Sequence, residues 1–224
     1  MPGPAQGSRR LPDWDINGLD SERREVAEQV TAGRGRLPTP YRVWLASPGL
    51  AKRMHPLGQF LSGMTSLSRA EAEIAILSAA RQWGGQYVLA VHAREAAAAG
   101  LAADVIAALT RGGPVEPADP RQRAVADMMA ALAADQVPPS PVFDAAVEVL
   151  GHEGVAEILA LAGYFTAVTL AMKMYGVAPP GDASRPLKKT TPPSLRSERR
   201  NVELTGLWSW ETPWTPSAGM RHKH

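Results

Sequence analysis

Residues 68–100, SRAEAEIAILSAARQWGGQYVLAVHAREAAAAG, decide the fold of this chain, because they carry two helical patterns joined by a Gly-Gly pair. Ser68 followed by Glu71 is a capping box, which predicts the start of the first helix. Apolar residues then recur at helical spacing on more than one side, so we expect this helix to be buried. Gly84-Gly85 interrupts the pattern, and a second helix is predicted from about residue 86 to its end at Gly100.

Helical signals also dominate the rest of the chain. Pairs with proline second, at residues 47–48, 119–120 and 140–141, place proline at the first position of a helix. Pro56 is expected to interrupt or bend the helix over residues 49–61, and Gly151 is expected to separate two helices. No segment between residues 47 and 176 has the two-residue period of a strand. The sequence therefore predicts an all-α core.

Composition divides the chain into three regions. Residues 1–35 are predicted to be an extended N-terminal arm with one short helix, and residues 36–180 carry the helical domain. Residues 181–224 form a tail rich in Pro, Ser, Thr and basic side chains, which cannot bury enough apolar surface to fold alone. Because Trp208, Trp210 and Trp214 each have a large apolar area to cover, we expect them to dock on this protein or on a neighbouring subunit.

Several classes of function are disfavoured by composition. The 224 residues include no cysteine, which excludes a disulfide framework, a thiolate nucleophile and any cysteine-ligated metal. The net charge of +2, from 24 basic and 22 acidic side chains, is too balanced to suggest nucleic-acid binding. With neither a signal-like N-terminus nor a long uncharged apolar run, we expect a cytoplasmic protein without membrane contact. His152-Glu153 lacks the second histidine of a zinc motif, so no metal site is predicted.

Two ionisable residues stand out against apolar surroundings. His92 is either a histidine satisfied inside the core or a reactive group, and Glu73 is either a buried ion-pair partner or a carboxylate suited to acid-base work. On one straight helix the 19 residues between them would place the two side chains about 100° apart. The Gly-Gly break must therefore reorient the second helix if they are to meet.

Four further residues are candidates for contact with a ligand. Gln86 and Tyr87 could hydrogen-bond a bound oxygen atom, Trp83 could wall an apolar pocket, and His55 could face a pocket. For each of them, a packing or turn-stabilising role is the alternative.

At these residues the chain resembles the carboxymuconolactone decarboxylase family, which also contains the alkylhydroperoxidase D type proteins. The peroxidase branch has the pattern Glu, eleven residues, Cys, two residues, Cys, three residues, His. On this sequence the pattern places the glutamate at Glu73, the cysteines at Gly85 and Val88, and the histidine at His92. The resemblance, which covers about residues 36–180, is thus to the cysteine-free branch. Members of that branch often have Glu-Trp at the positions of Val88-Leu89.

The resemblance implies an alkylhydroperoxidase D-like (AhpD-like) helical bundle that assembles as a homotrimer or hexamer, whereas the tail over residues 181–224 is not a feature of the family. It also implies a cofactor-independent lyase (decarboxylase) or isomerase that acts on a small unsaturated carboxylate, lactone or related carbonyl compound. His92 would be the donor or acid, Glu73 would orient it, and Arg81 could hold the substrate carboxylate if it turns inward. The alternative is a non-catalytic member that binds a small ligand or serves as an oligomeric scaffold. Thiol peroxidase activity has no possible nucleophile here.

Overall fold

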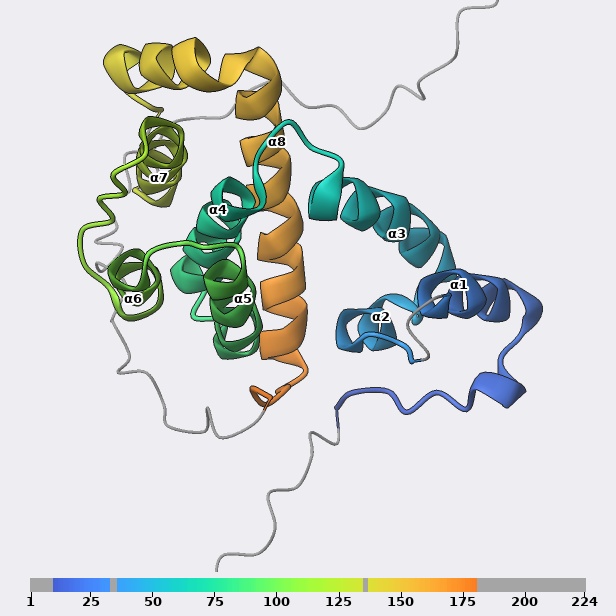
Figure 1. Cartoon of the computed structure of the whole chain (residues 1–224). Helices are drawn as coiled ribbons and strands as arrows, with labels where there is room; N and C mark the ends of the chain where they lie inside the picture. The colour runs from blue at the N-terminus through green and yellow to red at the C-terminus, as the bar shows by residue number, and fades with distance from the viewer. Residues whose placement is uncertain (1–9, 33–35, 135–136, 181–224) are drawn as a thin grey trace, which may run out of the picture. The chain divides into compact units, whose positions relative to one another are not determined.

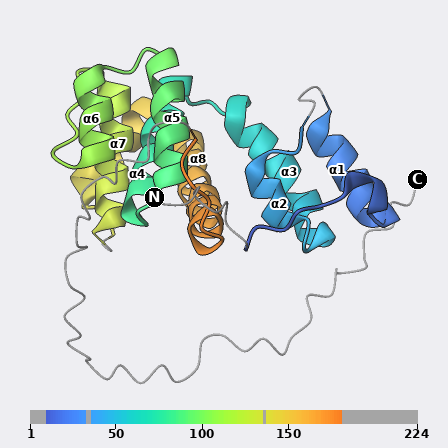
Figure 2. The same cartoon turned by 90° about the horizontal axis from the view of Figure 1, so that it is seen from below.

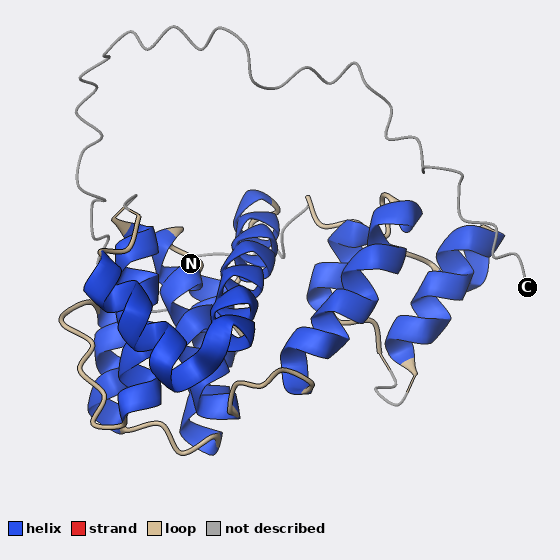
Figure 3. Ribbon diagram, turned by 90° about the horizontal axis from the view of Figure 1, so that it is seen from above, coloured by secondary structure: helices blue, strands red, loops and turns tan. Residues whose placement is uncertain are grey.

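The computed structural model describes residues 10–32, 36–134 and 137–180. Over these ranges the regular structure is helical and contains no strand (Figure 3), which confirms the all-α prediction. All of the described residues fall within one compact unit. The tail over residues 181–224, and the docking predicted for its tryptophans, lie outside the described residues.

The described helices follow one another with short connections. A 3-10 turn at Ile16–Gly18 precedes α1 (Ser21–Thr31), α2 (Thr39–Trp44), α3 (Pro48–Gly63), α4 (Arg69–Gln82), α5 (Gln86–Ala98), α6 (Ala103–Arg111), α7 (Pro120–Ala133) and α8 (Ser140–Met174). The helix α3 continues through Pro56 without ending there.

The helix α4 is the centre of the main apolar core. Ten of its fourteen residues are buried, and it packs against α5, α6, α7 and α8 (Figures 1 and 2). Its aliphatic residues, such as Ile74 and Leu77, belong to one apolar cluster with Leu109 of α6 and Ile158 of α8. A helix covered on all sides must be apolar all round. The buried acidic residues of α4 are therefore exceptions that need a specific explanation.

A second apolar cluster is formed by α1, α2 and α3. Val26 and Val30 of α1 pack with Tyr41, Leu45 and Ala51 of the next two helices. The helices α2 and α3 in turn contact α8. The N-terminal helices are thus joined to the main core through α8.

Local signals set the ends of α4 and α5 as predicted. The Oγ of Ser68 accepts a hydrogen bond from the Glu71 amide, and the Glu71 carboxylate accepts one from the Ser68 amide, which completes the capping box. The helix α4 ends at Gln82, and Gly84 has a φ of +66°, a left-handed conformation that favours glycine. The chain therefore turns at the predicted Gly-Gly pair before α5 begins.

The helix α8 corresponds to the two helices predicted on either side of Gly151. At that residue φ is +70° and ψ is 171°, so the backbone leaves the helical conformation and α8 consists of two helical segments joined at a sharp bend, as Figure 1 shows. Of the described helices, α8 is long and apolar enough to cross a membrane by length and composition. Half of its apolar window is buried inside the structure.

Candidate functional site

Glu73 and His92 meet between α4 and α5. The Oε2 atom of Glu73 lies 2.9 Å from Nδ1 of His92. The Glu73 side chain is 0% exposed, while the His92 side chain retains 17% exposure. An ionised carboxylate can only accept a hydrogen bond, so Nδ1 of the imidazole carries the proton in this contact. The other ring nitrogen, Nε2, has no hydrogen-bond partner among the described residues and is left available for chemistry.

Arg69 lies on the solvent side of Glu73, one helical turn before it. The Nη2 atom of Arg69 is 2.8 Å from Oε1 of Glu73 and 3.4 Å from Oε2 of Glu95. The first contact has the distance of an ion pair but not the geometry of a hydrogen bond, so Oε1 is a buried oxygen without a hydrogen-bond partner among the described residues. The guanidinium supplies the positive charge that a buried carboxylate requires.

The imidazole of His92 has an aromatic neighbour on α8. The ring of Phe165 packs edge-on against it with 5.0 Å between the ring centroids. On α5 itself, Val88 and Leu89 lie one turn before His92 and are buried. The position of Val88 thus carries a buried apolar side chain and no acidic group.

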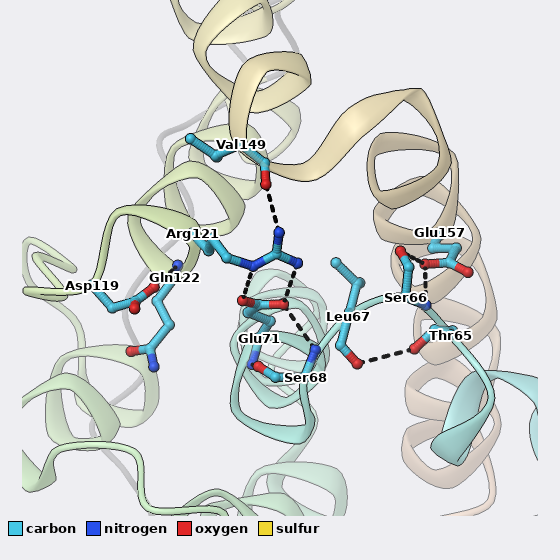
Figure 4. A network of polar contacts seen from close by, with 10 residues as sticks. All are labelled: Thr65, Ser66, Leu67, Ser68, Glu71, Asp119, Arg121, Gln122, Val149 and Glu157. Carbon is cyan, nitrogen blue, oxygen red and sulfur yellow. Dashed lines mark hydrogen bonds and ion pairs between the residues drawn. The ribbon is translucent and has the colours of Figure 1, made fainter.

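A polar network anchors the beginning of α4, one turn before Glu73 (Figure 4). The Arg121 guanidinium on α7 donates to both carboxylate oxygens of Glu71, at 2.7 and 3.2 Å, and also to the carbonyl of Val149 beside the bend of α8. The hydrogen bond to Glu71 is the main cause that raises the pKa of Arg121. In the preceding loop, the amide and hydroxyl of Ser66 both donate to Glu157 of α8. These contacts tie the helix that carries Glu73 to α7 and α8.

The structure places Arg81 and Trp83 away from the Glu73–His92 pair. Arg81 lies eight residues after Glu73, about 12 Å along α4. Its Nη1 donates to the Ala108 carbonyl at 2.7 Å, so it closes the end of α6 and does not turn toward His92. Trp83 lies beyond the end of α4, half-exposed, and its carbonyl accepts a hydrogen bond from Lys173.

Gln86 and Tyr87 lie in the first turn of α5 and are half-buried. They precede His92 by six and five residues, so their side chains leave the helix about 120° and 140° away from that of His92. Tyr87 packs against the main core. The structure does not bring these two side chains onto the face of α5 that meets Glu73.

His55 lies in a different environment, between α2, α3 and α8. Its Nδ1 is 3.2 Å from the hydroxyl of Tyr41, and both side chains are buried. The hydroxyl of Tyr164, on α8, lies over Gly58 one turn further along α3. His55 therefore belongs to a polar cluster that joins the N-terminal helices to α8. Ring contacts connect this cluster with the candidate site: Tyr164 packs against Phe165, and Phe165 packs against His92.

A groove of about 350 Å³ lies between the end of α7 and the first part of α8. Its lining is almost wholly apolar and includes none of the residues predicted for the site: Met128, Leu132, Val137, Pro138, Ser140, Phe143, Val155 and Leu159. Within the described ranges, no group of three or more His, Asp or Glu side chains is arranged to hold a metal ion.

Three residues of the site were not among those predicted from the sequence. Arg69 precedes Glu73 by four residues and Glu95 follows His92 by three, spacings that place each pair on one helical face. These two residues could have been found from the sequence. Phe165 lies 73 residues beyond His92 on another helix, and no local pattern relates the two.

Comparison with known proteins shows a likeness to solved structures. No protein family model matches the chain, and no curated protein sequence matches it significantly. Among solved structures, it is similar to an uncharacterized peroxidase-related protein from Silicibacter sp. TM1040, with a TM-score of 0.64 and 17% sequence identity, over 84% of this chain and 100% of that chain. At this identity the likeness shows a shared fold, in keeping with an alkylhydroperoxidase D-like helical fold. Function must be argued from the site itself.

Proposed function

We propose that this protein is a cofactor-independent lyase or isomerase that acts on a small unsaturated carboxylate, lactone or related carbonyl compound, with His92 as the proton-transfer group. The observation that carries this proposal is the hydrogen bond between His92 Nδ1 and the fully buried carboxylate of Glu73. A core histidine could be satisfied by a backbone carbonyl. A buried carboxylate is a costly partner, which suits a site where a charged orienting group is useful.

The geometry supports a division of roles between the two residues. Glu73 holds the Nδ1 proton, which fixes the tautomer and the orientation of the ring. Nε2 is then the nitrogen that exchanges a proton with the substrate. Phe165 packs edge-on against the imidazole, whose side chain keeps 17% exposure, and removing water from part of the ring strengthens its electrostatic interactions with the substrate.

Both reaction types need only proton transfer at this atom. In a decarboxylation, the carbon–carbon bond to the carboxylate breaks, its electron pair moves into the conjugated carbonyl group, and carbon dioxide leaves. A protonated His92 then delivers the Nε2 proton to carbon, and solvent restores it. In an isomerisation, neutral Nε2 takes a proton from the carbon beside the carbonyl and returns it at another carbon of the conjugated system. Neither sequence of steps requires a thiol.

The test is a turnover assay on carboxylated unsaturated lactones and enol acids with wild type, His92→Asn and Glu73→Gln. Because general acid-base groups contribute about 10²- to 10⁴-fold to a rate, we expect His92→Asn to lower kcat by roughly that factor. Glu73→Gln should have a smaller effect, since it retains a side chain beside Nδ1. The matched control is His152→Asn, which removes an exposed histidine on α8 and should leave the rate unchanged.

The circular dichroism spectrum and melting temperature of each variant must accompany the rates, so that loss of folding is not mistaken for loss of chemistry. If the wild type turns over a substrate and folded His92→Asn is equally fast, the proposed role of His92 is wrong. If the wild type binds these compounds without turnover, a non-catalytic ligand-binding role replaces the lyase proposal.

A further inference from the structure

Arg69 is the positively charged group that contacts the Glu73–His92 pair. Its guanidinium is held in place by a hydrogen bond from Nη1 to the Ser62 carbonyl, 3.0 Å away, and by the ion pair with Glu73. The other described arginines of this region are engaged elsewhere: Arg81 binds the Ala108 carbonyl, and Arg94 binds the Pro180 carbonyl. Arg69 is therefore the anchored cation at the candidate site.

The outer side of Arg69 already holds a carboxylate. Glu95 reaches Nη2 with a long contact of 3.4 Å, and its side chain is 51% exposed. The Glu73 contact is 2.8 Å, and the Glu73 side chain is 0% exposed while that of Arg69 is 40% exposed. An exposed, long ion pair contributes little to stability and breaks easily, whereas a buried one does not. Of the two acidic partners of Arg69, Glu95 is thus the one that another carboxylate can replace.

The position of Glu95 lies beside the imidazole. Glu95 follows His92 by three residues on α5, so the two side chains leave the same face of the helix, with Cβ atoms about 5–6 Å apart. A carboxylate that takes the place of Glu95 on Arg69 would then lie next to the His92 ring. The separation of about 5–6 Å between the Cβ atoms of His92 and Glu95 suits a small substrate that is held at one end by Arg69 and reacts at Nε2 of His92.

We propose that Arg69 binds the carboxylate of the substrate, and that Glu95 occupies this place in the free protein and leaves it when the substrate binds. The inference rests on the proposed function, because it assigns to the Glu73–His92 site a substrate that carries a carboxylate. Arg69 is the specificity-determining residue, and Glu95 is its internal competitor.

Charge and donor capacity both fit this exchange. On the guanidinium itself one carboxylate replaces another, and the displaced Glu95 side chain, which is 51% exposed, can turn its charge into the solvent. A guanidinium has five N–H donors, and the contacts above leave some of them without a described partner. A ligand carboxylate can therefore bind in the two-pronged manner that Glu95, at its present distance, does not achieve.

The experiment is a ligand-observed NMR titration of the full-length protein with crotonate, a small unsaturated monocarboxylate, and with crotonamide as its uncharged counterpart. In Glu95→Gln the competitor loses its charge, so crotonate should bind about three- to fivefold more tightly than to wild type. In Arg69→Gln crotonate binding should weaken by about tenfold or more. Crotonamide should not respond to either substitution.

Removing Arg69 leaves Glu73 buried without its cation and could unfold the protein, so Arg69→Lys is the second variant. It keeps the charge but loses the planar fork, and binding should again weaken. Arg94→Gln is the matched control, because it removes an arginine from α5 that does not contact the site, and it should bind crotonate like wild type.

Equal crotonate affinity in wild type, Arg69→Lys and Glu95→Gln overturns the inference, and so does an absence of binding in Glu95→Gln at the highest soluble concentration. The proposed function fails separately. His92→Asn tests turnover, and if it has no effect while the Arg69 dependence of binding persists, Arg69 is a carboxylate-binding residue of a protein that does not use His92 for catalysis.

Discussion

The backbone of Gly85 lies directly against the side chain of Thr169, so closely that a Cβ atom at residue 85 would overlap the Thr169 methyl group. This contact brings the first turn of α5 onto α8. Phe165, one turn before Thr169 on α8, packs against His92 further along α5. The close approach at Gly85 therefore helps to fix the orientation in which α5 presents His92 to Glu73.

Gly85→Ala should destabilise the protein by about 1–3 kcal/mol, because the added methyl group overpacks the contact with Thr169. The double variant Gly85→Ala/Thr169→Ser, which removes the opposing methyl group, should recover part of that loss. Gly163→Ala is the control, since a Cβ there meets nothing within 4 Å. The free energy of unfolding of the wild type and the three variants is measured by urea denaturation. A Gly85→Ala protein as stable as wild type would show that Gly85 and Thr169 are not in close contact.

Gly58→Ala should also destabilise the protein, by about 1–3 kcal/mol, because a Cβ at this position meets the hydroxyl of Tyr164. Adding Tyr164→Phe removes that oxygen and should restore some stability. Thermal unfolding by circular dichroism is the measurement. Gly63→Ala, with open space around the added carbon, is the matched substitution in α3 and should change little. An equal loss in Gly58→Ala with and without Tyr164→Phe would rule out the hydroxyl as the cause.

Glu71→Gln should lower the free energy of unfolding by about 2–3 kcal/mol. The glutamine can still accept the hydrogen bond of the capping box, but it loses the ionic pairing with Arg121. A double-mutant cycle with Arg121→Gln isolates the pairwise contribution. Glu153→Gln is the control, because Glu153 is an exposed acidic residue of α8 near the bend at Gly151. Its free energy of unfolding should stay within about 0.5 kcal/mol of the wild-type value. A coupling energy near zero would show that the pair is not formed in solution.

The stabilising effect of Asp20 should disappear in acid. The backbone amide of Arg23, followed by its side chain, holds the pKa of the Asp20 carboxylate below its ordinary value. A carboxylate with a lowered folded pKa stabilises the fold above the unfolded pKa, near 4, and loses that effect as the pH falls through the folded value. The difference in urea midpoint between wild type and Asp20→Asn should thus be constant near neutral pH and shrink below about pH 4. A difference that does not change with pH would refute this assignment.

Much of the fold can be predicted from the sequence, because the signals that start and end helices are local. The Ser68–Glu71 capping box and the Asp119-Pro120 pair satisfy backbone groups within one turn, and the structure shows both. Gly84 lies where the chain needs a left-handed residue. The burial of α4 also follows from its sequence, since it is apolar on every side.

The spacing of Glu73 and His92 identifies the pair, but the sequence does not determine that they touch. On a single straight helix their side chains would point about 100° apart. Their 2.9 Å contact depends on the angle between α4 and α5, which in turn depends on Gly85 packing against Thr169 of a distant helix. Such packing joins residues far apart in the sequence, so no local pattern reports it.

Tertiary structure likewise decided which arginine lies beside Glu73 and His92. Arg69 and Arg81 both lie on α4, and the sequence shows each as a basic side chain with a possible carboxylate to bind. The end of α6 packs beside Arg81, and the Ala108 carbonyl there accepts a hydrogen bond from the Arg81 guanidinium in addition to the one from the Gly112 amide, which keeps Arg81 away from the site. Arg69 remains beside Glu73 because the two are one helical turn apart and because α5 brings Glu95 to its other side. Sequence determined which groups are present, and helix packing decided which of them meet, because a buried charge is stable only where the fold supplies its partner.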